Sequence, residues 1–349
     1  MYRTFVDLTT PWVDRLATAL ARAAGARRGA ILCFHGLDAD EAPSRSSMHV
    51  PLALLEATVA AVQTLGAIVP LPDLLTRHGA GRDTAGLIAI TADDAYASLL
   101  AAEPFLKRSG VPLTVFAVSD ALAVGRTFWW DRVDDVFPLV PSERWRRFEE
   151  ECGLPDSFRR GQPVNEGPVR PLRQWVLAEH AGRWPKALEE PMARLEHEVG
   201  QRTVQRSMTE QELVGFVTRT GAQVGVHTVS HRVLPLLADD DLRGEIARCY
   251  EDLRACVRDT LPYLAIPFGL FDRRTLRLAE EAGMRASLTL AGASVTQRPA
   301  PALGVPRFCV VREYTPGAVA LKVSGVAAVV DRLRGRSASP YPSLPSPTT

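Results

Sequence analysis

Residues 87–96, which read LIAITADDAY, limit the possible folds of this chain more than any other stretch. Their apolar, β-branched first half predicts a buried strand, which ends at two adjacent carboxylates, Asp93 and Asp94. A helical pattern follows at 97–107. Because the carboxyl ends of strands open onto the functional site in parallel α/β folds, acids at this point indicate chemistry. The alternative is that both aspartates only cap the following helix, for which Asp is a favoured residue.

Strands and helices alternate through most of the chain, which predicts parallel βα units. Further apolar strands are predicted directly before His227 and before Pro267, and at 29–34, 67–71, 113–118, 286–290 and 305–310. Amphipathic helices are predicted at 11–24, 48–65, 209–220, 239–258, 273–282 and 316–333. The helix at 209–220 opens with the capping box Thr209–Glu212.

The alternation stops between residues 128 and 207. This stretch is rich in Arg and Glu, and Trp145, Trp175 and Trp184 recur in it at helical intervals. We expect a helical insertion at about 128–207 that packs over the mouth of the domain. The remaining limits are an N-terminal helical extension at 1–28, the α/β domain at 29–335, and a disordered tail at 336–349, which is rich in Pro, Ser and Thr.

The composition is that of an ordinary globular protein, with 46% hydrophobic and 23% charged residues. A net charge of +1 gives no reason to expect binding to nucleic acid or to an anionic membrane. The five cysteines form no CxxC pair and suit a reducing compartment better than a disulfide framework. Neither a signal-peptide pattern nor an apolar run long enough to span a membrane is present, so we expect a cytoplasmic protein.

His227 and His231 stand four residues apart at the end of a predicted strand. This spacing suits two imidazoles on one metal ion, although such pairs also arise from chance and core packing. Two imidazoles and one carboxylate of the Asp pair make a three-ligand site that leaves positions open for water and substrate, as catalytic zinc requires. The other carboxylate can then act as a general base.

Three stretches together, TADDA at 91–95, HTVSH at 227–231 and IPFG at 266–269, resemble the first three motifs of the polysaccharide deacetylase family, the NodB-homology fold. The resemblance implies a distorted (β/α)7 barrel, here with a helical insertion, that removes acyl groups from sugars with a divalent metal ion. It further implies that Asp93 is the catalytic base and that Asp94, His227 and His231 bind the metal. Zinc is the ion that we expect.

The chain departs from the family pattern at several positions. Ala92 and Ala95 stand where the family usually has Phe and Gly, and no late histidine supplies a general acid. Some family members carry that acid in an aromatic-His motif on the first strand, so His35 is the candidate acid; a structural role is the alternative. The usual base-orienting arginine is also missing. Arg307, on the last predicted strand, can replace it; a surface or C-terminal salt bridge is the alternative.

We therefore expect a metal-dependent hydrolase that removes an N-acyl group from an amino sugar. Acetyl is the acyl group that we expect. The setting is an intracellular glycan, glycolipid or secondary-metabolite pathway, and the partner is a saccharide or glycoconjugate. Substrate contacts are expected from a backbone N–H near Tyr96, from the rings of Trp129 and Trp130, unless these are core residues, and from Pro267, Phe268 and Gly269. The alternatives are a non-catalytic carbohydrate-binding member of the same fold and a hydrolase of non-sugar amides.

Overall fold

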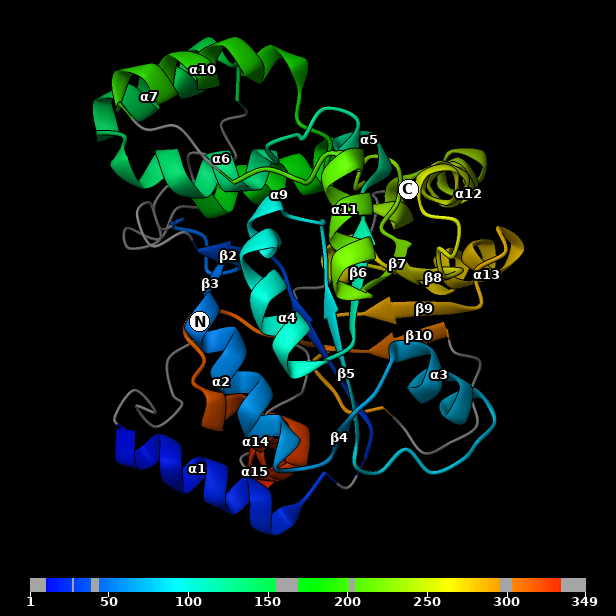
Figure 1. The fold of residues 1–349 in the computed structure, drawn as a ribbon. Coiled ribbons are helices and arrows are strands. Elements are labelled where there is room, and N and C mark those ends of the chain that lie inside the picture. Colours follow the sequence, from blue (N-terminus) through cyan, green and yellow to red (C-terminus); the bar gives the residue numbers. More distant parts are fainter. Residues whose placement is uncertain are drawn as a thin grey trace.

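The computed structural model describes residues 11–26, 28–38, 44–154, 169–200, 205–295 and 303–333. Its centre is a nearly closed barrel in which every strand pair is parallel (Figure 1). The strands run in the order β10 (Leu303–Pro306), β9 (Ala286–Thr289), β8 (Tyr263–Ala265), β7 (Gln223–Val226), β6 (Leu113–Ala117), β5 (Leu87–Ala92), β1 (Ala30–Phe34) and β11 (Phe308–Cys309). The short β4 (Ala67–Ile68) also pairs with β5, and β2 (Leu37–Asp38) pairs with β3 (Val50–Pro51) in a separate sheet.

The barrel closes at Arg307. The sequence predicts one strand at 305–310, but the structure divides it: β10 pairs with β9, and β11 pairs with β1. Arg307 lies between the two short strands, so the last segment of the barrel joins both of its edges. Counting β10 and β11 as one segment, the structure has the seven parallel segments of a distorted (β/α)7 barrel, and the predicted fold class is confirmed.

The strands are buried on both faces, as expected when helices cover the outside of a parallel barrel. Alternate residues belong to two different apolar clusters. Ile31, Ala89 and Phe116 pack together inside the barrel, whereas Leu32 and Ile90 pack against the outer helices. This period-2 separation explains why the strands read as continuous apolar runs in the sequence.

The outer helices agree with the sequence patterns in most places, but two expected helices are broken, and the strand expected at 67–71 ends at Ile68, so that an unpredicted helix begins at Leu71. The outer helices are α1 (Pro11–Ala24), α2 (Leu52–Gln63), α3 (Leu71–Gly79), α4 (Glu103–Ser109), α5 (Ser119–Leu122), α11 (Glu210–Thr220), α12 (Asp239–Cys256), α13 (Arg273–Glu281), α14 (Pro316–Ser324) and α15 (Val326–Leu333). The helix expected at 97–107 is a 3₁₀ turn, Ala97–Ala102, followed by α4, whose first turn contains Pro104 and so lacks a backbone donor there. The helix expected at 316–333 is interrupted by Gly325, which has φ +82°.

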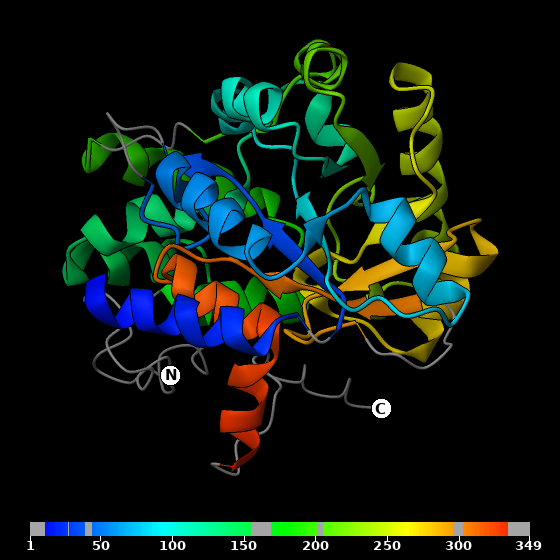
Figure 2. The ribbon, with the colours of Figure 1, turned by 60° about the horizontal axis from the view of Figure 1, so that its bottom comes forward.

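The first described helix packs against the last but one. Figure 2 shows α1 next to α14, and the Gly317 N–H donates a 2.7 Å hydrogen bond to Asp14 Oδ1. A side chain at Gly317 would lie 2.4 Å from the Asp14 carbonyl oxygen, so the close approach requires glycine. The tail at 336–349 lies outside the described residues. None of the described helices combines the length and the apolarity that a membrane span requires.

Between β6 and β7, the described residues form helices with an apolar core of their own. These helices are α6 (Trp129–Val136), α7 (Ser142–Glu151), α9 (Val169–Glu179) and α10 (Glu189–Glu198), with short 3₁₀ turns at Phe137–Leu139 and Lys186–Leu188. Their core includes Phe137, Trp145 and Met192. Figure 1 shows the four helices grouped at one end of the barrel, beyond β2 and β3.

Candidate active site

The site is built from residues that directly follow the barrel strands. His35 follows β1, the pair Asp93–Asp94 follows β5, His227 follows β7 and Arg307 follows β10. Because the strands are parallel, these positions all lie at the carboxyl end of the barrel. The structure therefore brings together the predicted base, acid and metal ligands, which are spread over more than 200 residues of sequence.

Asp94, His227 and His231 point their ligand atoms at one another. Asp94 Oδ1 lies 3.4 Å from Nε2 of His227 and 3.4 Å from Nε2 of His231, and all three side chains are buried. Within the described residues, Asp94 Oδ1 has no hydrogen-bond partner. Burial lowers the pKa of His231 to about 3, so its imidazole is neutral and its nitrogen lone pair is available. A buried carboxylate and two imidazoles in this arrangement fit a divalent cation.

The two histidines are oriented in different ways. His227 Nδ1 lies 2.8 Å from the Ala265 carbonyl oxygen on β8, the kind of bond that usually fixes a metal-binding histidine. Burial opposes charge on His227, but Asp93 and Asp94 outweigh it and raise the pKa above its usual value. His231 Nδ1, by contrast, has no hydrogen-bond partner among the described residues.

Asp93 is held by Arg307 in a two-point contact. The two terminal nitrogens of Arg307 donate to Asp93 Oδ1 and Oδ2 at 2.7 Å each, and one of them also reaches Thr91 Oγ1 at 3.1 Å. The Arg307 side chain is fully buried above the Phe116 ring in the barrel interior. Burial alone would raise the pKa of Asp93, but Arg307 and His227 hold it far below its usual range. Asp93 is therefore ionised and fixed in orientation.

The capping alternative for the aspartate pair does not describe this structure. The residue that precedes the 3₁₀ turn Ala97–Ala102 is Tyr96, and no side chain caps that turn. The oxygens of Asp93 are bonded to Arg307, and Asp94 Oδ1 faces the two histidines. The alternative of a surface or C-terminal salt bridge for Arg307 is wrong, because the residue is fully buried and its ion-pair partner is the candidate base, Asp93.

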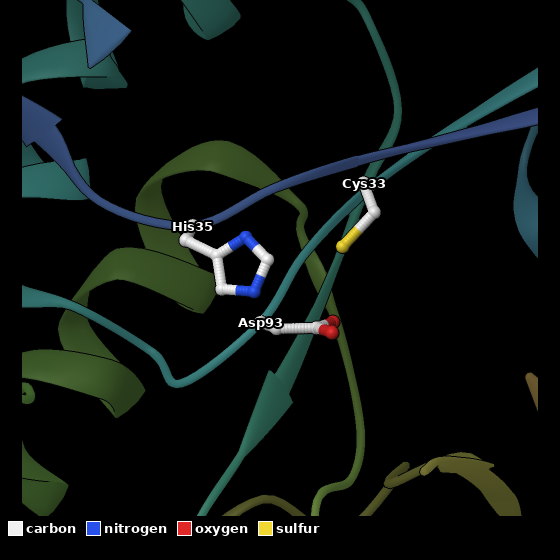
Figure 3. Close-up of side chains that lie close together, drawn as sticks. All are labelled: Cys33, His35 and Asp93. Atoms are coloured by element: carbon white, nitrogen blue, oxygen red, sulfur yellow. The ribbon is translucent and has the colours of Figure 1, made fainter. Parts of the chain in front are cut away.

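His35 lies beside Asp93 together with a thiol that sequence reasoning missed. Figure 3 shows the Cys33 sulfur, the His35 ring and the Asp93 carboxylate turned toward a common space, and their ligand atoms lie within 4.8 Å of one another. The Cys309 sulfur lies 4.0 Å from His35 Nδ1. Burial lowers the pKa of His35 and raises the pKa of Cys309 to about 12. The signal for Cys33 is its position two residues before His35 on one strand, which places both on one face.

Strained backbone concentrates at this site. Asp94, Ala95, Thr228, His231 and Phe268 all have φ between +49° and +68° without being glycine. Ala95, where the related motif has Gly, takes up the left-handed conformation at φ +49°. Such residues cost about 1–3 kcal/mol each and persist only where surrounding contacts enforce them. The fold thus accepts a loss of stability in the loops that carry Asp94 and His231, and the surrounding contacts hold these loops in the observed conformation.

The predicted substrate contacts occupy less open positions than expected. The Tyr96 side chain is buried, so only its backbone N–H stays a prediction for substrate contact. Trp129 and Trp130 are each 8% exposed. One face of Trp130 stacks on Phe128, and Trp129 stacks on Trp184, so these faces are not free for a sugar ring.

Both tryptophans nevertheless border a cavity of about 660 Å³ that reaches His231. This volume is in the range of small-molecule sites. In the third motif, Phe268 packs on His231 with ring centroids 4.4 Å apart, and Pro267 is buried. A side chain on Gly269 would lie 2.8 Å from the Leu290 Cβ, so this glycine serves the close packing of β8 and β9. Direct contact of the motif with substrate stays a prediction.

The fold and the site define a distorted (β/α)7 barrel with an aspartate–histidine cluster at its carboxyl end. Residues 171–287 match the model of the polysaccharide deacetylase family. The resemblance of the chain to that family and to its NodB-homology fold is thereby confirmed.

Solved structures agree with this fold at low sequence identity. IcaB from Ammonifex degensii matches with a TM-score of 0.54 and 16% identity, over 86% of this chain and 98% of that one. The Streptococcus pyogenes deacetylase PplD, solved in complex with acetate, matches with a TM-score of 0.52 and 12% identity, over 84% and 97%. A de-N-acetylase from Aggregatibacter actinomycetemcomitans gives 0.50 and 12%, over 82% and 96%. None of the curated proteins matches the chain.

Proposed function

We propose that this protein is a metal-dependent deacetylase that hydrolyses the N-acetyl group of an amino sugar. The observation that carries the proposal is the pair of adjacent carboxylates with separate partners. Asp94 Oδ1 lies 3.4 Å from Nε2 of both imidazoles, whereas both oxygens of Asp93 are held by Arg307 at 2.7 Å, and Asp93 Oδ2 lies 3.8 Å from His227 Nε2. One carboxylate is thus placed to bind a cation, and its neighbour is placed to handle a proton.

Asp94, His227 and His231 would hold the ion. A divalent cation in this position supplies a Lewis acid, which polarises an acyl carbonyl and lowers the pKa of a bound water. Zinc is consistent with a donor set of two nitrogens and one oxygen.

Asp93 accepts the proton of the attacking water. Arg307 does not increase the basicity of this carboxylate, because it stabilises the ionised form. Its contribution is to keep Asp93 charged and to fix the direction of its oxygen lone pairs. The two-point contact also holds Asp93 Oδ2 at 3.8 Å from Nε2 of His227, beside the ligand set.

His35 donates a proton to the leaving amine. It is buried next to Asp93 and Asp94, and burial lowers its pKa, so the free protein holds it neutral. His35 becomes an acid only after Asp93 has removed a proton from water and that proton has reached the His35 imidazole. The required sequence is therefore base first and acid second, as amide hydrolysis demands.

The substrate is an amino sugar inside the cell. The cavity that reaches His231 is large enough for a sugar unit, and its lining combines aromatic edges with arginines, among them Arg126, Arg183 and Arg232. All five cysteines are free thiols, which is consistent with a reducing compartment.

Incubation of zinc-loaded protein with oligomers of N-acetylglucosamine tests the proposal. We expect release of acetate and the appearance of a free amine, detected by mass spectrometry, and loss of both after chelation. The Asp93→Asn protein is the matched control, because it keeps the ligand set and lacks the proton acceptor. Saccharide binding by the zinc-loaded protein without any acetate release would instead support the non-catalytic carbohydrate-binding alternative.

A further inference from the structure

No side-chain hydrogen bond among the described residues fixes the orientation of the His231 ring. Its partner histidine, His227, is fixed by the 2.8 Å contact of Nδ1 with the Ala265 carbonyl oxygen. The corresponding nitrogen of His231 is buried and has no partner in the described part of the chain. A metal-binding imidazole normally needs such a partner, because free rotation of the ring weakens binding. Something else must hold this ring.

Aromatic rings from two different parts of the chain enclose His231. The Trp130 ring lies 4.5 Å away between centroids, and the Phe268 ring lies 4.4 Å away and nearly perpendicular, at 82°. Phe128 stacks on Trp130 at 4.6 Å with an interplanar angle of 8°. Trp130 is therefore held between Phe128 and His231. Edge and tilted contacts of this kind fix the direction of a ring as well as its position.

A chain of buried hydrogen bonds fixes Trp130 in turn. Trp130 Nε1 donates to the Tyr96 hydroxyl at 2.9 Å, and that hydroxyl donates to Asp131 Oδ2 at 2.6 Å. The other oxygen of Asp131 lies 2.8 Å from Nε2 of His49, and His49, Tyr96 and Asp131 are at most 1% exposed. Each bond in such a network is strong because the surroundings exclude water.

The network joins the insertion to both sides of the ligand set. Asp131 and Trp130 belong to α6, whereas Tyr96 lies two residues after Asp94 in the same loop. His49 comes from the segment before β3, and Gly36, next to His35, leaves room for it: a side chain there would lie 1.9 Å from His49 Nδ1. A single carboxylate, Asp131, thus ties the Asp94 loop to the ring that packs on His231.

We propose that Trp130 and Asp131 of the helical insertion are positioning residues for His231, in the role that the Ala265 carbonyl plays for His227. The inference rests on the proposed function, because it assigns His231 to a metal ion. It also assigns the insertion a purpose, which is to complete the orientation of the ligand set from outside the barrel.

Trp129 offers a matched control. It neighbours Trp130 on α6, is also 8% exposed, and also donates from Nε1 at 2.9 Å, in its case to the Gly182 carbonyl oxygen. Its ring stacks on Trp184 and meets Trp130 edge-on at 5.6 Å between centroids, but no ring contact joins it to His231 among the described residues. Loss of either indole therefore removes the same amount of buried ring and one hydrogen bond from the insertion, but only Trp130 packs against the candidate ligand.

The experiment measures the zinc dissociation constant of the full-length, chelator-stripped protein by competition with a chelating dye. We expect Trp130→Leu to weaken zinc binding by about 10–100-fold, the usual effect of removing a group that orients a ligand. Trp130→Phe should recover only part of the loss, because it keeps a ring against His231 but cannot donate to the Tyr96 hydroxyl. Trp129→Leu should leave the constant unchanged. In the cobalt-substituted protein, the visible absorption bands should shift in Trp130→Leu and stay unchanged in Trp129→Leu.

Equal zinc affinity in Trp130→Leu and Trp129→Leu would overturn the inference while leaving the proposed function in place. Wild-type protein that binds no divalent metal would overturn the proposed function itself. Should Trp130→Leu fail to fold, Tyr96→Phe keeps the ring and removes the hydroxyl that joins Trp130 to Asp131. Weaker zinc binding in that variant supports the inference, and unchanged binding refutes it.

Discussion

Arg307 and Asp93 form a buried two-point ion pair across 214 residues of sequence, with both contacts at 2.7 Å. Arg307 lies where the last segment of the barrel changes its pairing partner from β9 to β1. The same residue therefore marks the closure of the barrel and orients the candidate base. Stability and function are coupled at this pair, and its removal should affect both.

Replacement of Arg307 by Met should lower the free energy of unfolding by about 3–5 kcal/mol, because it leaves the Asp93 charge buried without a partner. The double variant Asp93→Asn/Arg307→Met removes that charge as well. It should recover a large part of the loss, which urea titration of the metal-free proteins at pH 7 would detect. A double variant as unstable as the single one would show that the packing of Arg307, and not its charge, stabilises the barrel.

Replacement of each of the two adjacent carboxylates by its amide should separate proton transfer from metal binding. Asp93→Asn should keep the metal and reduce the deacetylation rate by about 10²–10⁴-fold, since it removes the general base. Asp94→Asn should instead lose metal, and part of its activity should return at high zinc concentration. Elemental analysis and rate measurements on both variants check this. Identical metal content and identical rates in the two variants would contradict the assignment.

The contribution of His35 to the rate should be larger for a poor leaving group than for a good one. His35→Gln should reduce hydrolysis of an N-acetyl amino sugar by about 10²–10⁴-fold, because an amine needs protonation to depart. Hydrolysis of 4-nitrophenyl acetate, whose leaving group departs without a proton, should fall far less. The ratio of the two rates is the measurement, and equal losses on both substrates would point to a structural role for His35.

The capping box of α11 predicts a pH dependence of stability. Glu212 accepts hydrogen bonds from Arg206 and from the Thr209 N–H, and the Arg206 bond, together with the cap, lowers its pKa to about 2. The stabilisation is complete above the unfolded pKa, near 4.3, and disappears as pH falls toward about 2. Because Glu212 and Arg206 are 29% and 40% exposed, the gain is about 1 kcal/mol or less.

Thermal unfolding of wild type and Glu212→Gln checks this dependence. The wild-type protein should be more stable at pH 7, and the difference should narrow steadily below pH 4. Glu198→Gln, which removes a surface pair with Arg144 at 3.4 Å, is the control and should change stability little at either pH. A difference that stays constant with pH would exclude titration of Glu212 as its cause.

The sequence predicted the parts of this fold that depend on local patterns. Alternation of apolar strands and helices, the Thr209 capping box and the aspartate pair at a strand end all reflect interactions within a few residues. The break at Arg307 was not predictable in this way, because residues 305–310 match a single short strand and only their pairing partners, far away in the chain, divide it. The barrel predicted from the family resemblance is nevertheless the one observed.

In the candidate site, too, the sequence predicted the residues that stand in short local motifs and missed those that only distant contacts bring together. Asp93, Asp94, His227 and His231 stand in short motifs, whereas the network around Asp131 joins residues 82 and 35 positions apart. Its members are a buried His, Asp and Tyr without a common motif. For Trp130 the sequence leaves a sugar contact and a core role open, and its contact with His231 is not predictable, because it forms only when the insertion is folded against the barrel.

The insertion also has a consequence for the order of folding. β6 and β7 are neighbours in the barrel, yet the paired residues Thr114 and Gln223 are 109 positions apart. Closing an unstructured loop of that length costs about 4 kcal/mol of chain entropy. The cost falls if the insertion collapses first, because Ser207 bonds to the Arg126 and Ala121 carbonyl oxygens and so brings its two ends together. If the insertion folds first, the loop that remains to be closed between β6 and β7 is therefore shorter than the sequence separation suggests.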